Sequence, residues 1–265
     1  MIQIPADLNS VLDVAWGRAK NAPGFLLEDE ARFLGIAAAC TPAQGAIVEI
    51  GSFKGRPTVM LATVAARYGL GPVVSIDPHN FNLKTATPAM AEGASTYEEF
   101  LASLRKAGVE QHVEVHRVFS KEMSAAWTRP VRLLWIDGDH TLKGATEDFE
   151  GFAPFLSDGA VVAIHDTLNA FAGPISVFVD RILRSSKYGP AGFVHSIAWA
   201  QYRPKDGSRF DAGRRNLYRR AAKLVPYVKD GAALKGMPKI LYKWNRARVP
   251  CAAVTAEGWA TMLEE

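Results

Sequence analysis

The middle of the chain alternates short, continuously apolar runs with stretches of helical periodicity, and this alternation constrains the fold more than any other feature. Apolar runs without polar alternation are typical of strands covered on both faces, and strands separated by helices form parallel sheets. We expect strands at 46–50, 73–77, 112–118, 131–136 and 160–164, and a sixth at 193–199. The sequence therefore predicts an α/β fold with a doubly wound, mostly parallel sheet.

Helical stretches lie before and between these strands. We expect them at 28–39, 57–68, 97–107, 142–156 and 175–185. Pro57 suits a first helical turn, where its missing N–H is not needed. Ligands in open α/β sheets bind at the carboxyl ends of the strands, so the polar residues that follow each strand are the candidates for function.

Composition excludes several other classes of protein. The chain has 265 residues, 48% apolar and 22% charged, which is unlike disordered, collagen-like or disulfide-scaffold proteins. Its two cysteines, Cys40 and Cys251, are too far apart in sequence to suggest a zinc or disulfide motif. No apolar run is long enough to cross a bilayer and no secretory leader is recognisable, so we expect a cytoplasmic protein.

The first predicted strand leads into a turn that carries an acid and two glycines. The residues EIGSFKG occupy 49–55, and the helix that follows offers free N–H groups to an anionic group. Asp77 ends the second strand, where a carboxylate can accept hydrogen bonds from ribose hydroxyls. Dinucleotide, flavin and nucleoside sites share such turns, but the spacing is not GxGxxG, which disfavours an NAD-dependent dehydrogenase.

Acids and histidines follow the fourth and fifth predicted strands. Asp137 and His140 come after the fourth strand, and His165 and Asp166 come after the fifth. Because neighbouring strands lie about 5 Å apart, these side chains can converge. Two carboxylates and an imidazole predict a divalent metal, Mg²⁺ or Mn²⁺, held by Asp137, His165 and Asp166.

Four motifs carry a resemblance to a known family: EIGSFKGR at 49–56, SIDPH at 75–79, WIDGDH at 135–140 and IHD at 164–166. Over about residues 25–200 the chain resembles class I S-adenosylmethionine-dependent methyltransferases. The resemblance implies a Rossmann-like methyltransferase sheet and S-adenosylmethionine as cofactor. We place the methyltransferase domain at 1–202, with N-terminal helices in 1–44, and a helical extension at 203–265.

The same resemblance implies which residues bind the cofactor. The predicted set is Glu49, Gly51, Ser52, Gly55, Thr58, Asp77, Ser120 and Asp137. In the family pattern, Gly51, Ser52 and Gly55 line the methionine part. Asp77 holds the ribose, Ser120 lies near the adenine, and Thr58 touches the methionine carboxylate. Pro57 stands where the family often has serine, which removes one hydroxyl contact.

Two further resemblances concern the chemistry. The acids after strands four and five are similar to those that bind Mg²⁺ in catechol O-methyltransferase-like enzymes, although His165 departs from the usual acidic or amide residue and favours a softer metal or none. His140 resembles the proposed general base in the Asp-Gly-x-His motif of antibiotic-pathway sugar O-methyltransferases. An imidazole that titrates near neutrality can take a hydroxyl proton during attack on the methyl group, or His140 instead caps the next helix.

The resemblance implies an enzyme that methylates a hydroxyl of a sugar or another small natural product. Two alternatives stay open. One is a hydroxylase-like relative on the same fold. The other is a non-catalytic cofactor-binding or membrane-adapter protein that uses its basic tail.

The basic tail is the last distinctive feature. Residues 203–248 carry 14 Lys and Arg against 3 Asp and Glu, and apolar residues recur at helical spacing over 214–229 and 234–244. These helices could cover the substrate pocket, pair two subunits, lie on an anionic membrane surface, or be a solvated extension. We expect a homo-oligomer with a small hydroxylated acceptor. We do not expect nucleic-acid binding, because the tail lacks a recognisable motif.

Overall fold

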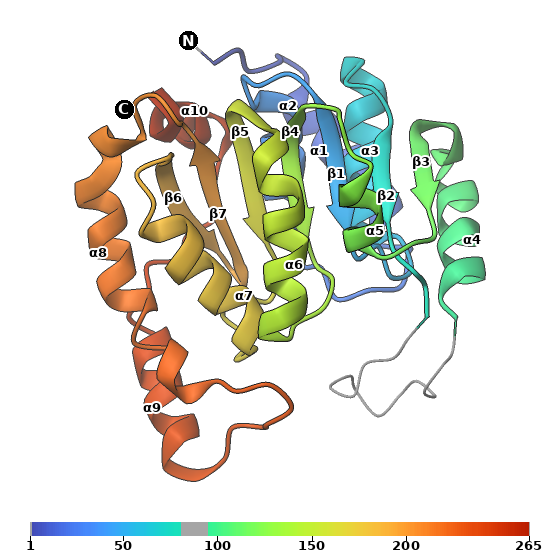
Figure 1. Cartoon of the computed structure of the whole chain (residues 1–265). Helices are drawn as coiled ribbons and strands as arrows, with labels where there is room; N and C mark the ends of the chain where they lie inside the picture. The colour runs from blue at the N-terminus through green and yellow to red at the C-terminus, as the bar shows by residue number, and fades with distance from the viewer. Residues whose placement is uncertain (1, 81–94, 265) are drawn as a thin grey trace.

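The computed structural model describes residues 2–80 and 95–264, and its central feature is a seven-stranded sheet (Figure 1). The strands are β1 Ala46–Ile50, β2 Val73–Ile76, β3 Val113–His116, β4 Val131–Ile136, β5 Leu156–Ile164, β6 Tyr188–Val194 and β7 Ile197–Tyr202. Their order is β3-β2-β1-β4-β5-β7-β6. The first five strands are parallel, whereas β7 runs antiparallel to β5 and to β6. The predicted α/β, mostly parallel fold is confirmed.

Helices cover both faces of this sheet (Figure 1). They are α1 Leu8–Ala19, α2 Glu28–Cys40, α3 Arg56–Tyr68, α4 Tyr97–Ala107, α5 Ser120–Ala125, α6 Leu142–Phe152, α7 Ala172–Val177, α8 Asp211–Ala221, α9 Gly236–Arg246 and α10 Ala256–Glu264. The side chains of α1 to α4 and α10 join one buried cluster, and those of α6 to α9 join a second. The chain is therefore doubly wound, with a separate core on each face.

Alternation along the strands divides the apolar side chains between the two cores. Ile47 and Leu133 belong to the cluster under α1 to α4, and their neighbours Val48 and Leu134 belong to the cluster under α6 to α9. All four are fully buried. A period of two sends successive side chains to opposite faces, so a strand covered on both faces must be apolar at every position.

The predicted elements differ from the structure mainly after residue 164. The run 193–199 is not one strand but the turn of a hairpin, because His195 adopts a left-handed conformation (φ 51°) between β6 and β7. The predicted helix 175–185 begins earlier, as α7, and continues as a π-helical segment over Phe178–Leu183. The predicted helix in 214–229 ends at Ala221, and a short 3₁₀ turn with Pro226 follows, because proline cannot continue the helix.

Backbone hydrogen bonds continue past the strand ends and hold the following loops in one row. Gly51 N–H donates to Ile76 O at 2.9 Å, Asp137 N–H to Ile50 O at 2.8 Å, and His165 N–H to Ile136 O at 2.9 Å. Gly51 has φ 83°, and a Cβ built on it would lie 2.3 Å from the carbonyl oxygen of Asp137. Only glycine allows the loops after β1 and β4 to approach so closely.

The segment after residue 203 packs into both cores. Leu217 and Ala221 of α8 and Tyr242 of α9 join the cluster on one face, and Trp259 of α10 is fully buried against Phe33 on the other. The domain boundary at 202 remains a prediction. These contacts mean that the segment is tied to the sheet by apolar burial.

The close approach at Gly51 generates a stability prediction. Gly51→Ala should lower the free energy of unfolding by about 3 kcal/mol or more. The new Cβ would overlap the backbone of Asp137, and alanine would also be strained in the left-handed conformation. Gly69 also has positive φ (62°), but a Cβ added there would meet no atom within 4 Å, so Gly69→Ala should cost only about 1 kcal/mol. Urea denaturation measures both variants. Equal losses would show that the contact between the two loops is not constraining.

Candidate active site

Asp77 joins the turn after β1 to the end of β2. Its carboxylate accepts hydrogen bonds from the backbone N–H of Phe53 at 2.8 Å and of His79 at 2.6 Å. The side chain remains 15% exposed. Because a carboxylate has about four acceptor positions, these two bonds orient Asp77 and leave capacity for a ligand hydroxyl.

Three predicted cofactor residues are sealed beneath the same turn. The hydroxyl of Thr58 donates to Glu49 at 2.6 Å, Ser52 exchanges a hydrogen bond with Ser75, and all of these side chains are buried. Glu49 Oε1 has no hydrogen-bond partner. Burial, followed by the charges of Asp137 and Asp77, raises the pKa of Glu49 to about 8 although the Thr58 hydrogen bond lowers it. Cofactor roles for these side chains stay predictions.

Ser120 starts α5 and lies beside an acid that sequence reasoning missed. Its hydroxyl donates to Asp148 on α6, and the other carboxylate oxygen of Asp148 is buried without a partner. A Cβ on Gly138 would lie 2.6 Å from that oxygen, so Asp148 packs against the loop after β4. Burial raises the pKa of Asp148 to about 7 although Ser120 lowers it. An acid at this position in the sequence carries no recognisable signal.

Asp137, His140 and Asp166 meet at the carboxyl ends of β4 and β5. His140 Nε2 lies 3.2 Å from Asp166 Oδ2 and 3.8 Å from Asp137 Oδ1. One ligand atom from each of the three residues lies within 4.8 Å of the others. The predicted convergence of these acids is therefore present, with His140 in the cluster.

Electrostatics within this cluster are dominated by the two carboxylates. Burial lowers the pKa of His140, but the neighbouring carboxylates of Asp137 and Asp166 outweigh burial and raise the pKa to about 9. Burial raises the pKa of Asp166, but His140 and His165 outweigh it and lower the pKa to about 2. The ring of Phe171 stacks on His140 at 4.3 Å between centroids, which fixes the imidazole plane.

His165 is buried and turns both ring nitrogens toward carboxylates. Its Nδ1 lies 3.0 Å from Asp137 Oδ1, and its Nε2 lies 3.4 Å from Glu30 Oε2. Burial lowers the pKa of His165, but Asp137, Glu30 and Asp166 together raise it well above its usual value. The geometry makes His165 a link between Glu30 and Asp137, and its predicted role as a metal ligand stays a prediction.

Glu30, on α2, is the second acid that sequence reasoning missed. It is 1% exposed and accepts hydrogen bonds from the backbone N–H groups of Leu27 and Ser196, both at 3.0 Å. Burial raises its pKa, but the hydrogen bond and charge of His165, with those backbone donors, lower it to about 2. Its sequence position, at the start of the helix predicted over 28–39, gave no reason to expect a contact with the loop after β5.

Three further residues of the SIDPH and WIDGDH motifs bond or pack within the protein. Asp139 accepts hydrogen bonds from the backbone N–H of Thr141 at 2.8 Å and from its hydroxyl at 3.0 Å. His79 is buried, with its Nδ1 2.9 Å from the hydroxyl of Thr96. Trp135 is fully buried in the core.

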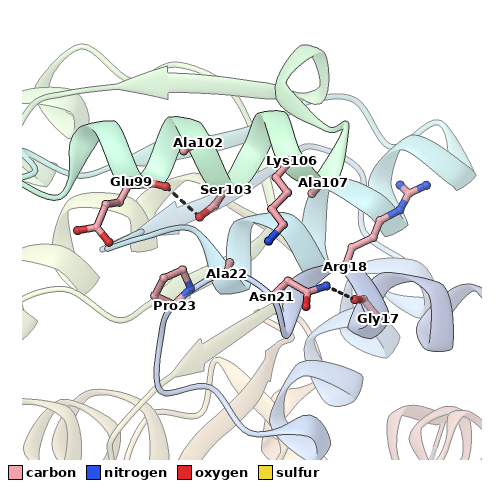
Figure 2. Close-up of a pocket in the computed structure, with 10 residues that line it drawn as sticks. All are labelled: Gly17, Arg18, Asn21, Ala22, Pro23, Glu99, Ala102, Ser103, Lys106 and Ala107. Atoms are coloured by element: carbon pink, nitrogen blue, oxygen red, sulfur yellow. Dashed lines mark hydrogen bonds between the residues drawn. The ribbon is translucent and has the colours of Figure 1, made fainter.

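A hollow of about 340 Å³ lies elsewhere, between the end of α1 and α4 (Figure 2). Two of its polar side chains bond within their own helix or turn: Asn21 donates to Gly17 O at 2.8 Å, and the hydroxyl of Ser103 donates to Glu99 O at 2.9 Å. The carboxylate of Glu99 pairs with Lys54 at 2.8 Å. None of its lining residues belongs to the predicted site. The hollow brings together no carboxylate pair or imidazole, so we do not assign the chemistry to it.

The segment after residue 203 borders the cluster from the other side. The carboxylate of Asp230 accepts the backbone N–H of Leu142, the first residue of α6, at 3.0 Å. The hydroxyl of Tyr242, on α9, accepts the backbone N–H of Ala170 at 3.0 Å. These contacts reach the loops that carry His140 and Asp166, and an acid at a helix N-terminus is stabilising.

Part of the chain is similar in sequence to a family of methyltransferases. Residues 48–167, somewhat less than half of the chain, match a family described as a methyltransferase domain. The matched segment runs from β1 to the loop after β5, so it contains the Asp137, His140 and Asp166 cluster.

Solved structures share the fold at low sequence identity. The O-methyltransferase NovP is 12% identical with a TM-score of 0.57, covering 74% of this chain and 98% of its own. TomG from Streptomyces achromogenes, solved with S-adenosylmethionine, is 16% identical with a TM-score of 0.51, covering 77% and 92%. An O-methyltransferase from Bacillus cereus, solved with S-adenosylhomocysteine, is 18% identical with a TM-score of 0.50, covering 76% and 93%.

The buried carboxylate of Glu30 generates a pH prediction. Its pKa of about 2 lies below the ordinary 4.5, so its contribution to stability is present above pH 4.5 and is lost as the pH falls toward 2. Urea denaturation across this pH range should show that the free energy of unfolding of the native protein falls by about 3 kcal/mol as Glu30 becomes protonated. Glu30→Gln should lack that loss, whereas Glu28→Gln, a half-exposed neighbour on the same helix, should retain it. An unchanged acid profile in Glu30→Gln would contradict the buried pairing.

The two carboxylates around His140 generate a second pH prediction. The ring protons of His140, assigned by their loss in His140→Ala, should titrate by NMR near pH 9. Asp166→Asn should lower that midpoint by about one unit or more, because one of the two neighbouring charges is removed. Asp139→Asn should not shift it, since Asp139 is bonded to Thr141 instead. A midpoint near 6.5 in the native protein would contradict the arrangement.

Proposed function

We propose that this chain is a class I S-adenosylmethionine-dependent methyltransferase that transfers a methyl group to a hydroxyl oxygen of a sugar or another small natural product. The match of residues 48–167 to a methyltransferase domain supports this proposal. The observation that carries this proposal is the meeting of His140 with Asp137 and Asp166 beside the glycine turn. In this proposal His140 would accept a proton within the row of loops where a cofactor of this fold binds.

Electrostatics at the turn favour a cationic cofactor. Asp77 and Asp137 both raise the pKa of Glu49, so three carboxyl groups lie close together around Gly51. A sulfonium and an amino group placed there would favour the ionised form of Glu49, whose Oε1 is otherwise without a partner. Asp77 would accept the ribose hydroxyls, and Ser120, backed by Asp148, would lie toward the adenine.

His140 is the proposed general base. Attack by a hydroxyl oxygen on the sulfonium methyl group forms a carbon–oxygen bond, breaks the carbon–sulfur bond and releases the hydroxyl proton, which neutral imidazole can accept. With a pKa of about 9, His140 is mostly protonated at neutral pH before ligands bind. Activity should therefore rise with pH, and a cationic cofactor nearby would lower that pKa. Positioning of the hydroxyl against the methyl group supplies the remaining contribution.

The two carboxylates of the cluster also fit a divalent cation, because carboxylate oxygens are suitable ligands for Mg²⁺ and Mn²⁺. Asp137 and Asp166 would hold the ion, while His165 and Glu30 keep Asp137 in position. A cation bound there would lower the pKa of an acceptor hydroxyl.

Replacement of His140 tests the proposal. Calorimetry should show that the native protein and His140→Ala bind S-adenosylhomocysteine with dissociation constants within about threefold, because His140 lies on the acceptor side. Transfer of labelled methyl groups to a panel of hydroxylated sugars should fall about 10²-fold to 10⁴-fold in the variant. His195→Ala is the matched control, since its half-exposed side chain lies outside the cluster.

Each outcome separates one part of the proposal. Failure of the native protein to bind S-adenosylhomocysteine would remove the cofactor assignment. Unchanged turnover in His140→Ala would remove the base assignment. Loss of Mn²⁺ binding in that variant would make His140 a ligand instead of the base.

A further inference from the structure

Helix α9 presents four large apolar side chains to solvent. Met237 is 63% exposed, Ile240 61%, Leu241 38% and Trp244 55%. Their spacing of three, four and seven residues places them on one side of the helix. The opposite side holds the buried Tyr242 and Asn245, which face the rest of the protein. Figure 1 shows α9 projecting beyond the sheet, at the end where the candidate site lies.

This apolar face differs from the other exposed apolar residues. Nine large apolar side chains are strongly exposed in the described parts of the chain, and four of them are on α9. Single exposed apolar residues are ordinary, whereas a group on one face marks a contact surface. Trp244 also stacks with Arg248, whose guanidinium lies 3.2 Å from the ring centroid.

Positive charge surrounds this face. The segment 231–248 holds five basic residues and no acidic ones. They are Lys235, Lys239, Lys243, Arg246 and Arg248, and all five are exposed. Within the described ranges no carboxylate forms an ion pair with any of them. The surface therefore combines apolar area with uncompensated positive charge.

Charge and apolar area together select the partner. A second copy of the chain docked through the same face would bring two strongly basic segments together, which is repulsive. Nucleic acid would match the charge, but its phosphates would not bury Met237, Ile240 and Trp244. An anionic lipid surface matches both, since apolar side chains enter the acyl boundary while Lys and Arg meet the headgroups. We propose that α9 docks this protein on anionic lipid bilayers.

Docking through α9 would hold the candidate site close to the headgroups. Tyr242 on α9 bonds the loop that carries Asp166, and Asp230 bonds the first turn of α6 next to His140. The reacting cluster is thus joined directly to the element that meets the lipid. No helix among residues 2–80 and 95–264 is long and apolar enough to cross a membrane, so the contact would be with one surface.

Vesicle cosedimentation tests the proposal with the full chain. The protein should sediment with vesicles of equal parts phosphatidylcholine and phosphatidylglycerol, not with phosphatidylcholine alone, and binding should weaken as salt is added. Lys239→Gln with Lys243→Gln should weaken binding about thirtyfold. Ile240→Ser should weaken it at least about fivefold, because an apolar contact is lost.

A matched control separates lipid docking from other contacts. Val14, on α1, is 53% exposed, so Val14→Ser removes a similar aliphatic group and should leave vesicle binding unchanged. S-adenosylhomocysteine binding, measured on every variant, should also stay unchanged, which reports that each one is folded. The proposal is overturned if anionic vesicles are not bound, if neutral vesicles bind equally, or if Ile240→Ser leaves binding intact. It is also overturned if that variant instead reduces the oligomeric mass, or if duplex DNA is bound more tightly than the vesicles.

Discussion

The row of backbone hydrogen bonds at the carboxyl ends of the parallel strands is the constraint on which the candidate site depends. It runs from His116 O to Asp77 N–H, from Ile76 O to Gly51 N–H, and onward through Asp137 to His165. Each bond fixes the first residue of a loop against its neighbour, so side chains distant in sequence meet at one edge. The row closes only because Gly51 has no Cβ to strike the backbone of Asp137.

Charge is concentrated behind this row. His165 links the buried Glu30 to the half-buried Asp137, and His140 lies beside Asp137 and Asp166. Burying charged groups is costly unless each one is paired, and here the carboxylates of Glu30 and Asp137 both face the imidazole of His165. The imidazole of His165 holds Asp137 in one orientation on its buried side. The rest of the Asp137 side chain is partly exposed and can contact a ligand. Under the proposed function, this negative charge would face a cationic cofactor.

The segment after residue 203 adds a second layer around the same edge. Tyr242 and Asp230 connect it to the loops after β5 and β4, while Trp259 anchors its end in the opposite core. One side of α9 therefore packs on the protein, and the other is exposed. Any surface that met the exposed side would be connected through Tyr242 to the loop that carries Asp166.

The sequence by itself determined the sheet, the strands that bear the site, and the identity of Asp77, Asp137, His140 and Asp166 as neighbours, because apolar runs and strand-end polar residues are local patterns. Only the tertiary structure revealed Glu30, which reaches the site from a helix more than a hundred residues away in the chain from Asp137. It also divided the run 193–199 at His195 and placed His165 between Glu30 and Asp137. These features depend on which helix covers which loop. Packing across the sheet decides this, and it involves residues far apart in sequence, so no local pattern predicts it.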